Sequence, residues 1–190
     1  MRRTFILTFA AMALVQLSGC DKPADKAAAT AASEPGAATL TAAIGGAAGM
    51  STVAAALKST GLSTVFDGTA SYTVLVPQDD AFGALGDAAA RLKAPENGAA
   101  MAAVIKAHVL PGYMTVADIG TALTKAQGKP VRITTMAGNE VTFTRSGETL
   151  NVTAADGSTA KVSGQELTAG NGVAIPVDAV LKKIPAPSVG

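Results

Sequence analysis

Hydrophobic and polar positions follow two different periods along this chain, and the change comes near residue 130. Before that point, apolar residues recur mainly at the spacing of helices, and one apolar, β-branched run predicts a buried strand. Ser51 is the expected N-cap of the first helix, and Gly45, Gly46 and Gly49 predict a flexible entry to it. The expected helices are Thr52–Ser59, Leu62–Phe66, Asp79–Leu85, Pro95–Ala107 and Val116–Gln127, and the expected buried strand is Tyr72–Val76.

After Lys129 the pattern alternates with period two, which predicts strands separated by Gly-containing hairpin turns. The expected strands of this part are Val131–Thr135, Glu140–Arg145, Leu150–Ala154, Thr159–Ser163 and, after the turn at 170–172, Val173–Leu181. A further short strand, His108–Leu110, is expected between the last two helices. The order predicts an α+β fold with short N-terminal helices packed on a largely antiparallel β-sheet or sandwich wedge.

The first residues have the pattern of a secretory signal. Arg2 and Arg3 form a short positive segment, and the apolar stretch Phe5–Leu17 that follows is too short to span a membrane as a helix. Residues 17–20, Leu-Ser-Gly-Cys, resemble the lipobox of bacterial lipoproteins. This resemblance implies cleavage before Cys20 and attachment of lipid to its sulfur, with two or three acyl chains giving a stable anchor.

The sequence therefore predicts a signal peptide over residues 1–19 and a lipidated, flexible tether over residues 20–39. The tether is rich in Ala, Lys, Pro and Gly and has no large apolar side chain with which to form a core. The globular domain is expected over residues 40–185, followed by a C-terminal tail over residues 186–190. The expected location is the bacterial cell envelope, with the protein anchored to a membrane and facing the periplasm or the exterior. Inner and outer membrane both remain open.

Charge and composition exclude nucleic acid as a partner. Without Arg2 and Arg3, 13 of the 15 basic residues remain against 14 acidic ones, so no basic field attracts phosphates. Aromatic residues make up only 4% of the chain, which is too few for a base-stacking platform.

Three segments, in this order, resemble the fasciclin (FAS1) domain. They are Tyr72–Phe82 (YTVLVPQDDAF), His108–Gly112 (HVLPG) and the stretch from Asn171 to Leu181 (NGVAIPVDAVL). The resemblance implies a fasciclin-like fold and a module for adhesion or interaction. Ala107 stands where the family usually has Tyr before the histidine, so the tyrosine-histidine adhesion motif of animal members does not carry over intact.

The candidate residues favour structure and contact over catalysis. His108 is the only histidine, and with no second His and only Cys20 the sequence offers no His/Cys metal site and no other cofactor site. Asp79 and Asp80 are expected at a helix N-terminus, where carboxylates meet free N–H groups. The candidate interaction or structural motif consists of Asp79, Asp80, His108, Val109, Leu110, Pro111 and Tyr113. No catalytic residue is expected.

The expected function is noncatalytic interaction or adhesion with an unidentified envelope protein or matrix component. A carrier of a small apolar ligand is the alternative, and it requires an enclosed apolar cavity. An enzyme and a purely structural or stress-related envelope protein are further alternatives.

Overall fold

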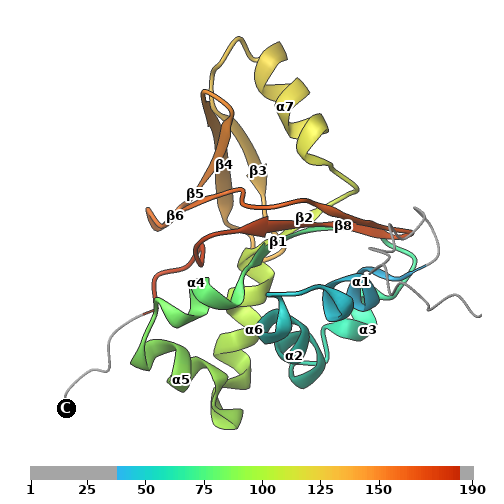
Figure 1. Cartoon of the computed structure of the whole chain (residues 1–190), viewed down its shortest axis with the longest axis vertical. Coiled ribbons are helices and arrows are strands. Elements are labelled where there is room, and N and C mark those ends of the chain that lie inside the picture. The colour runs from blue at the N-terminus through green and yellow to red at the C-terminus, as the bar shows by residue number, and fades with distance from the viewer. Residues whose placement is uncertain (1–37, 185–190) are drawn as a thin grey trace, which may run out of the picture. The chain divides into compact units, whose positions relative to one another are not determined.

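The computed structural model describes residues 38–184, which form two four-stranded sheets with helices around them (Figure 1). The signal peptide, Cys20, all but the last two residues of the predicted tether and the predicted tail lie outside the described residues. No helix within 38–184 is long and apolar enough to cross a bilayer.

The first sheet has the order β2-β1-β8-β7 and forms the centre of the domain. Its strands are β1 (Tyr72–Pro77), β2 (Val109–Pro111), β7 (Leu167–Ala169) and β8 (Gly172–Val177). β1 and β8 run parallel, with Tyr72 opposite Gly172 and Pro77 opposite Val177, whereas the other two pairings are antiparallel. Both faces of β1 and β8 are covered, which explains why their sequences are continuous apolar runs.

Helices cover one face of this central sheet. They are α1 (Leu40–Gly46), α2 (Ser51–Ser59), α3 (Ser63–Phe66), α4 (Asp79–Gly83), α5 (Asp87–Lys93) and α6 (Gly98–Ala107), with the 3-10 turn η1 (Pro95–Asn97) before α6. Val74, Val76 and Val109 point into this helical layer, where they join a core that includes Phe66 and Phe82.

The second sheet and helix α7 cover the other face. The sheet has the order β3-β4-β5-β6, all antiparallel, with β3 (Val131–Thr134), β4 (Glu140–Ser146), β5 (Thr149–Ala154) and β6 (Thr159–Lys161). Helix α7 spans Val116–Lys125. Leu75, Leu110 and Ile175 point into this layer and pack in one cluster with Phe143 and Leu123. The predicted α+β fold, with N-terminal helices on a largely antiparallel sheet or sandwich, is confirmed.

Several local predictions were wrong. Met50, not Ser51, is the N-cap of α2, and Gly45 and Gly46 belong to helix α1, which the sequence did not predict. Helix α5 and strand β7 were also missed. The last strand ends at Val177, because the backbone turns there and Val162 makes only an isolated bridge to it.

Candidate functional site

The candidate residues around strand β2 divide into a buried group and an exposed group. His108, Val109 and Leu110 are buried, whereas Pro111 and Tyr113 are exposed, Tyr113 to 42%. Strand β2 is an edge of the central sheet, so the chain emerges at the surface as soon as the strand ends.

The imidazole of His108 joins two distant segments of the chain. Its Nδ1 lies 2.8 Å from the carbonyl oxygen of Val104 in α6, and its Nε2 lies 2.8 Å from the backbone nitrogen of Leu181. Because the Leu181 N–H can only donate, Nε2 accepts, and Nδ1 must carry the proton that it donates to Val104. His108 therefore holds the C-terminal segment against the end of α6 as a neutral side chain.

Burial sets the protonation state of this histidine. The ring is almost completely inaccessible to solvent, and burial lowers the pKa of His108 to about 4, although the Val104 carbonyl and the charge of Asp156 act in the opposite direction. A second proton would also place an N–H against the N–H of Leu181. The structure thus gives His108 a role in holding backbone segments, in a place where no solvent reaches it.

A threonine of the neighbouring strand fixes the loop that carries Tyr113. The Thr73 hydroxyl accepts a hydrogen bond from the Met114 N–H at 2.8 Å and lies 2.9 Å from the Gly112 carbonyl, to which it donates. Gly112 has a φ of +95°, a backbone conformation that glycine adopts without strain. These hydrogen bonds fix the loop to strand β1, and Tyr113 is exposed to solvent.

Asp79 stabilises a helix other than its own. Its carboxylate accepts hydrogen bonds from the Thr52 N–H at 2.8 Å, the Ser51 hydroxyl at 2.8 Å and the Ser51 N–H at 3.2 Å, all in the first turn of α2. Partial burial raises the pKa of Asp79, but these hydrogen bonds outweigh it and lower the pKa to about 2. Asp80 is exposed at the start of α4.

The structure does not bring all the candidate residues together. Tyr113 lies near the first residue of β1, because Tyr72 pairs with Pro111, whereas Asp79 follows the last residue of that strand. A strand of six residues is about 17–20 Å long, so the two residues lie at opposite ends of it. Among residues 38–184, no group of His, Cys, Asp and Glu is placed to hold a metal ion.

Sequence reasoning missed one residue that organises the end of the domain near Tyr113. The Asn171 side chain accepts from the Leu40 N–H at 2.8 Å and donates to the carbonyls of Phe66 and Gly68. It thereby links α1, α3 and β8. The Gly-Asn-Gly pattern showed the turn, but no local signal shows partners that lie more than 100 residues away.

A groove between α2 and the segment from α5 to α6 is relevant to the carrier alternative. It has a volume of about 500 Å³, and its lining includes Ala55, Ala56, Leu92 and Met101. The groove is open to solvent, whereas a carrier cavity encloses most of its ligand.

Comparison with known proteins places these features in a family. The family model of the Fasciclin domain matches residues 48–183. The fold is similar to that of a FAS1 domain pair from the insect cell adhesion molecule fasciclin I, with a TM-score of 0.68 and 14% identity. That match covers 78% of this chain and 52% of the insect chain, so this chain spans about half of the insect structure. No curated protein matches the sequence.

Proposed function

Because this chain belongs to the fasciclin family, we propose that it is an extracytoplasmic lipoprotein whose domain binds an envelope protein or matrix component without catalysing a reaction. Fasciclin domains are in general noncatalytic adhesion or interaction modules. The family supplies the general role, and the residues of this chain supply the proposed anchor and contact surface.

The observation that carries the proposal is the way in which the polar side chains around strands β1 and β2 are used. His108, Thr73 and Asp79 all bind backbone groups of other segments, and they do not face one shared cavity. The hydrogen bonds of His108 and Thr73 fix the chain before and after strand β2, and Pro111 and Tyr113 lie exposed at the end of that strand. An exposed tyrosine on a fixed loop is well suited to contact a partner, since aromatic side chains contribute strongly to protein interfaces.

The proposed anchor is supported by the first 20 residues of the sequence. A short basic segment, an apolar stretch and the residues Leu-Ser-Gly-Cys occur in the order that a lipoprotein signal requires. Lipid on Cys20 would keep the domain at the surface of a membrane, facing the periplasm or the exterior.

The anchor can be tested by labelling cells with an alkyne fatty acid and fractionating them. The native chain should carry the label and enter the membrane fraction, whereas Cys20→Ala should lose the label and leave that fraction. Ser18→Ala is the matched control, because a small residue before Gly19 is preserved. The anchor is misassigned if Cys20→Ala remains labelled and membrane-bound.

The contact surface can be tested in intact cells with a photo-crosslinking amino acid. Benzoylphenylalanine at position 113 should give a discrete crosslinked product with an envelope protein or matrix component. Val65 is a matched control position, because its side chain is 41% exposed, almost the same as Tyr113. Equal products from both positions, or none from position 113, would contradict the proposed surface.

A further inference from the structure

An arginine of β4 lies across helix α7, beyond the end of the hydrophobic core. Val141, Phe143 and Arg145 alternate onto the same face of β4, and the first two are buried in the core between this sheet and the central sheet. Helix α7 packs on the same core through Ile119 and Leu123. Arg145 therefore lies on the core-facing side of β4, beyond Phe143, the last buried residue of that side.

Gly120 provides the space for this arginine. A methyl group on Gly120 would lie 2.8 Å from Nη2 of Arg145, so the guanidinium occupies the volume that a side chain at position 120 would fill. Glycine within a helix costs about 1 kcal/mol relative to alanine. No positive φ requires glycine at this position. The absence of a side chain thus lets the guanidinium lie close to the helix backbone.

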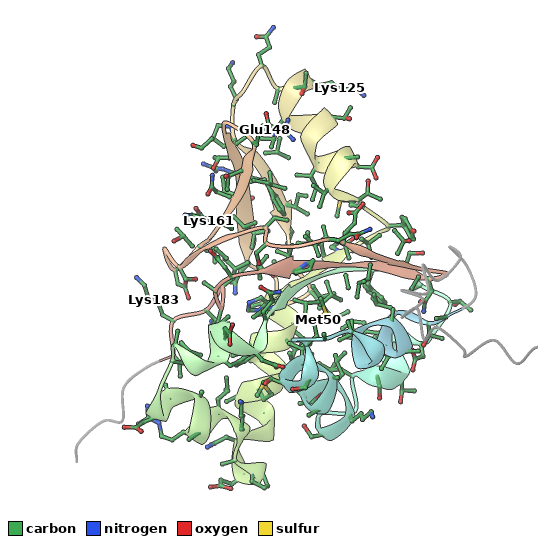
Figure 2. The ribbon with its side chains drawn as sticks, viewed as in Figure 1. Met50, Lys125, Glu148, Lys161 and Lys183 are labelled. Atoms are coloured by element: carbon green, nitrogen blue, oxygen red, sulfur yellow. The ribbon has the colours of Figure 1, made fainter. Side chains whose placement is uncertain are left out.

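The guanidinium forms one wall of an open groove of about 470 Å³. The groove is lined by Ala117, Gly120, Thr121, Thr124, Lys125 and Arg145, which include two cations and no carboxylate. The ion pair found within residues 38–184 is Arg132–Glu140, so neither cation of the groove has a carboxylate partner in the described part of the chain. Figure 2 shows Lys125 on α7 and Glu148 on the β4–β5 hairpin, and Glu148 does not line the groove.

We propose that this groove binds the carboxylate groups of an acidic polysaccharide. Arginine binds a carboxylate through two parallel N–H donors, and a lysine at the same groove adds a second positive charge. The Thr124 hydroxyl donates to the Gly120 carbonyl and keeps its lone pairs for a ligand hydroxyl, and Thr121 is exposed beside it.

The lining also decides between a sugar and a protein as the partner. Protein interfaces depend on buried aromatic or large aliphatic anchors in their central pockets, and this groove has no large apolar lining residue that would form one. Small side chains and hydroxyls beside two cations match a polymer that is rich in hydroxyls and carries regularly spaced carboxylates. The inference rests on the proposed binding function, and it names a partner class at a surface distinct from Tyr113.

The test measures binding of the full chain to short oligogalacturonates by isothermal titration calorimetry, with neutral dextran oligomers as the uncharged comparison. The native chain should bind only the acidic sugar. Arg145→Gln and Lys125→Gln should each weaken binding about tenfold, the effect expected for the loss of one charge-assisted hydrogen bond. Lys161→Gln, which removes a cation from strand β6, is the matched control and should bind like the native chain (Figure 2).

Gly120→Ala separates binding from folding. The added methyl displaces only the flexible end of Arg145, so the variant should be at least as stable as the native chain and still lose binding about tenfold. Unchanged binding by Gly120→Ala and Arg145→Gln would overturn the site, and poly-glutamate binding as tightly as the sugar would overturn the polysaccharide assignment. Absence of any oligogalacturonate binding would also refute the inference, whereas the proposed interaction function is tested separately by the crosslink at position 113.

Discussion

His108 couples the stability of the domain to pH between about pH 6.5 and pH 4. Its pKa is about 4 in the folded protein and 6.5 in the unfolded chain, so the unfolded chain binds the proton more tightly. The stability that the neutral His108 side chain contributes is complete above pH 6.5, falls as the pH drops below that value and is fully lost below pH 4. From these two pKa values, lowering the pH from 7 to 5 should cost about 2 kcal/mol of unfolding free energy.

Replacing His108 with leucine should abolish this pH dependence and destabilise the domain at pH 7. The substitution leaves the Val104 carbonyl and the Leu181 N–H buried without the partners that the ring supplies. Each unsatisfied group costs about 1–3 kcal/mol, so the expected loss is about 2–6 kcal/mol, a large part of the stability of a small domain.

Urea unfolding followed by far-ultraviolet circular dichroism at pH 7 and pH 5 measures both effects. Asp79 does not interfere, because its pKa is lowered from 3.8 to about 2, so its contribution is nearly the same at pH 7 and pH 5 and is lost only at lower pH. The native chain alone provides a test even if the leucine variant does not fold. Equal unfolding free energies of the native chain at the two pH values would refute the reasoning, as would a stable leucine variant that keeps the native pH dependence.

Two further substitutions test contacts within the domain. Asp79→Asn should lower the unfolding free energy by about 1 kcal/mol at pH 7, because the carboxylate that caps α2 is lost, whereas the matched change Asp80→Asn should have no effect. The difference in unfolding free energy between the native chain and Asp79→Asn should disappear as the pH falls from about 5 through 2. Acid titration of the native chain and both variants checks this. Gly172→Ala should cost about 3 kcal/mol or more, because its methyl would overlap the Tyr72 carbonyl, an unyielding backbone atom. Gly83→Ala has open space at the end of helix α4 and should leave the thermal midpoint unchanged or raise it slightly, so equal midpoints for the two alanine variants would contradict the packing argument.

Features that depend on neighbours in sequence were predictable. Thr115 and Asp118 are three residues apart, and their reciprocal hydrogen bonds form the capping box that begins α7. The hairpins of the second sheet follow from alternating residues and glycine turns. In contrast, α5 has three consecutive alanines and little apolar contrast, so its sequence gave no helical stripe to detect.

Features that depend on distant segments were not predictable from local pattern. Asp79 was expected at the start of a helix, and it is there, but its carboxylate binds α2, 27 residues earlier. Arg145 was expected at the end of a strand, and nothing in its neighbourhood indicates Gly120 as its contact. Strand β7 is three residues long and is defined by its pairing with β8 more than by its own sequence.

The parallel pairing of β1 with β8 determines when the protein can fold during its synthesis. About 100 residues separate these two strands, and contacts between such distant segments form late and slowly. Until the ribosome has made residues 172–177, β1 has only the three-residue strand β2 beside it. The central sheet therefore closes only after residues 172–177 have left the ribosome, so the domain folds as one unit around its last strand and not segment by segment as the helices emerge.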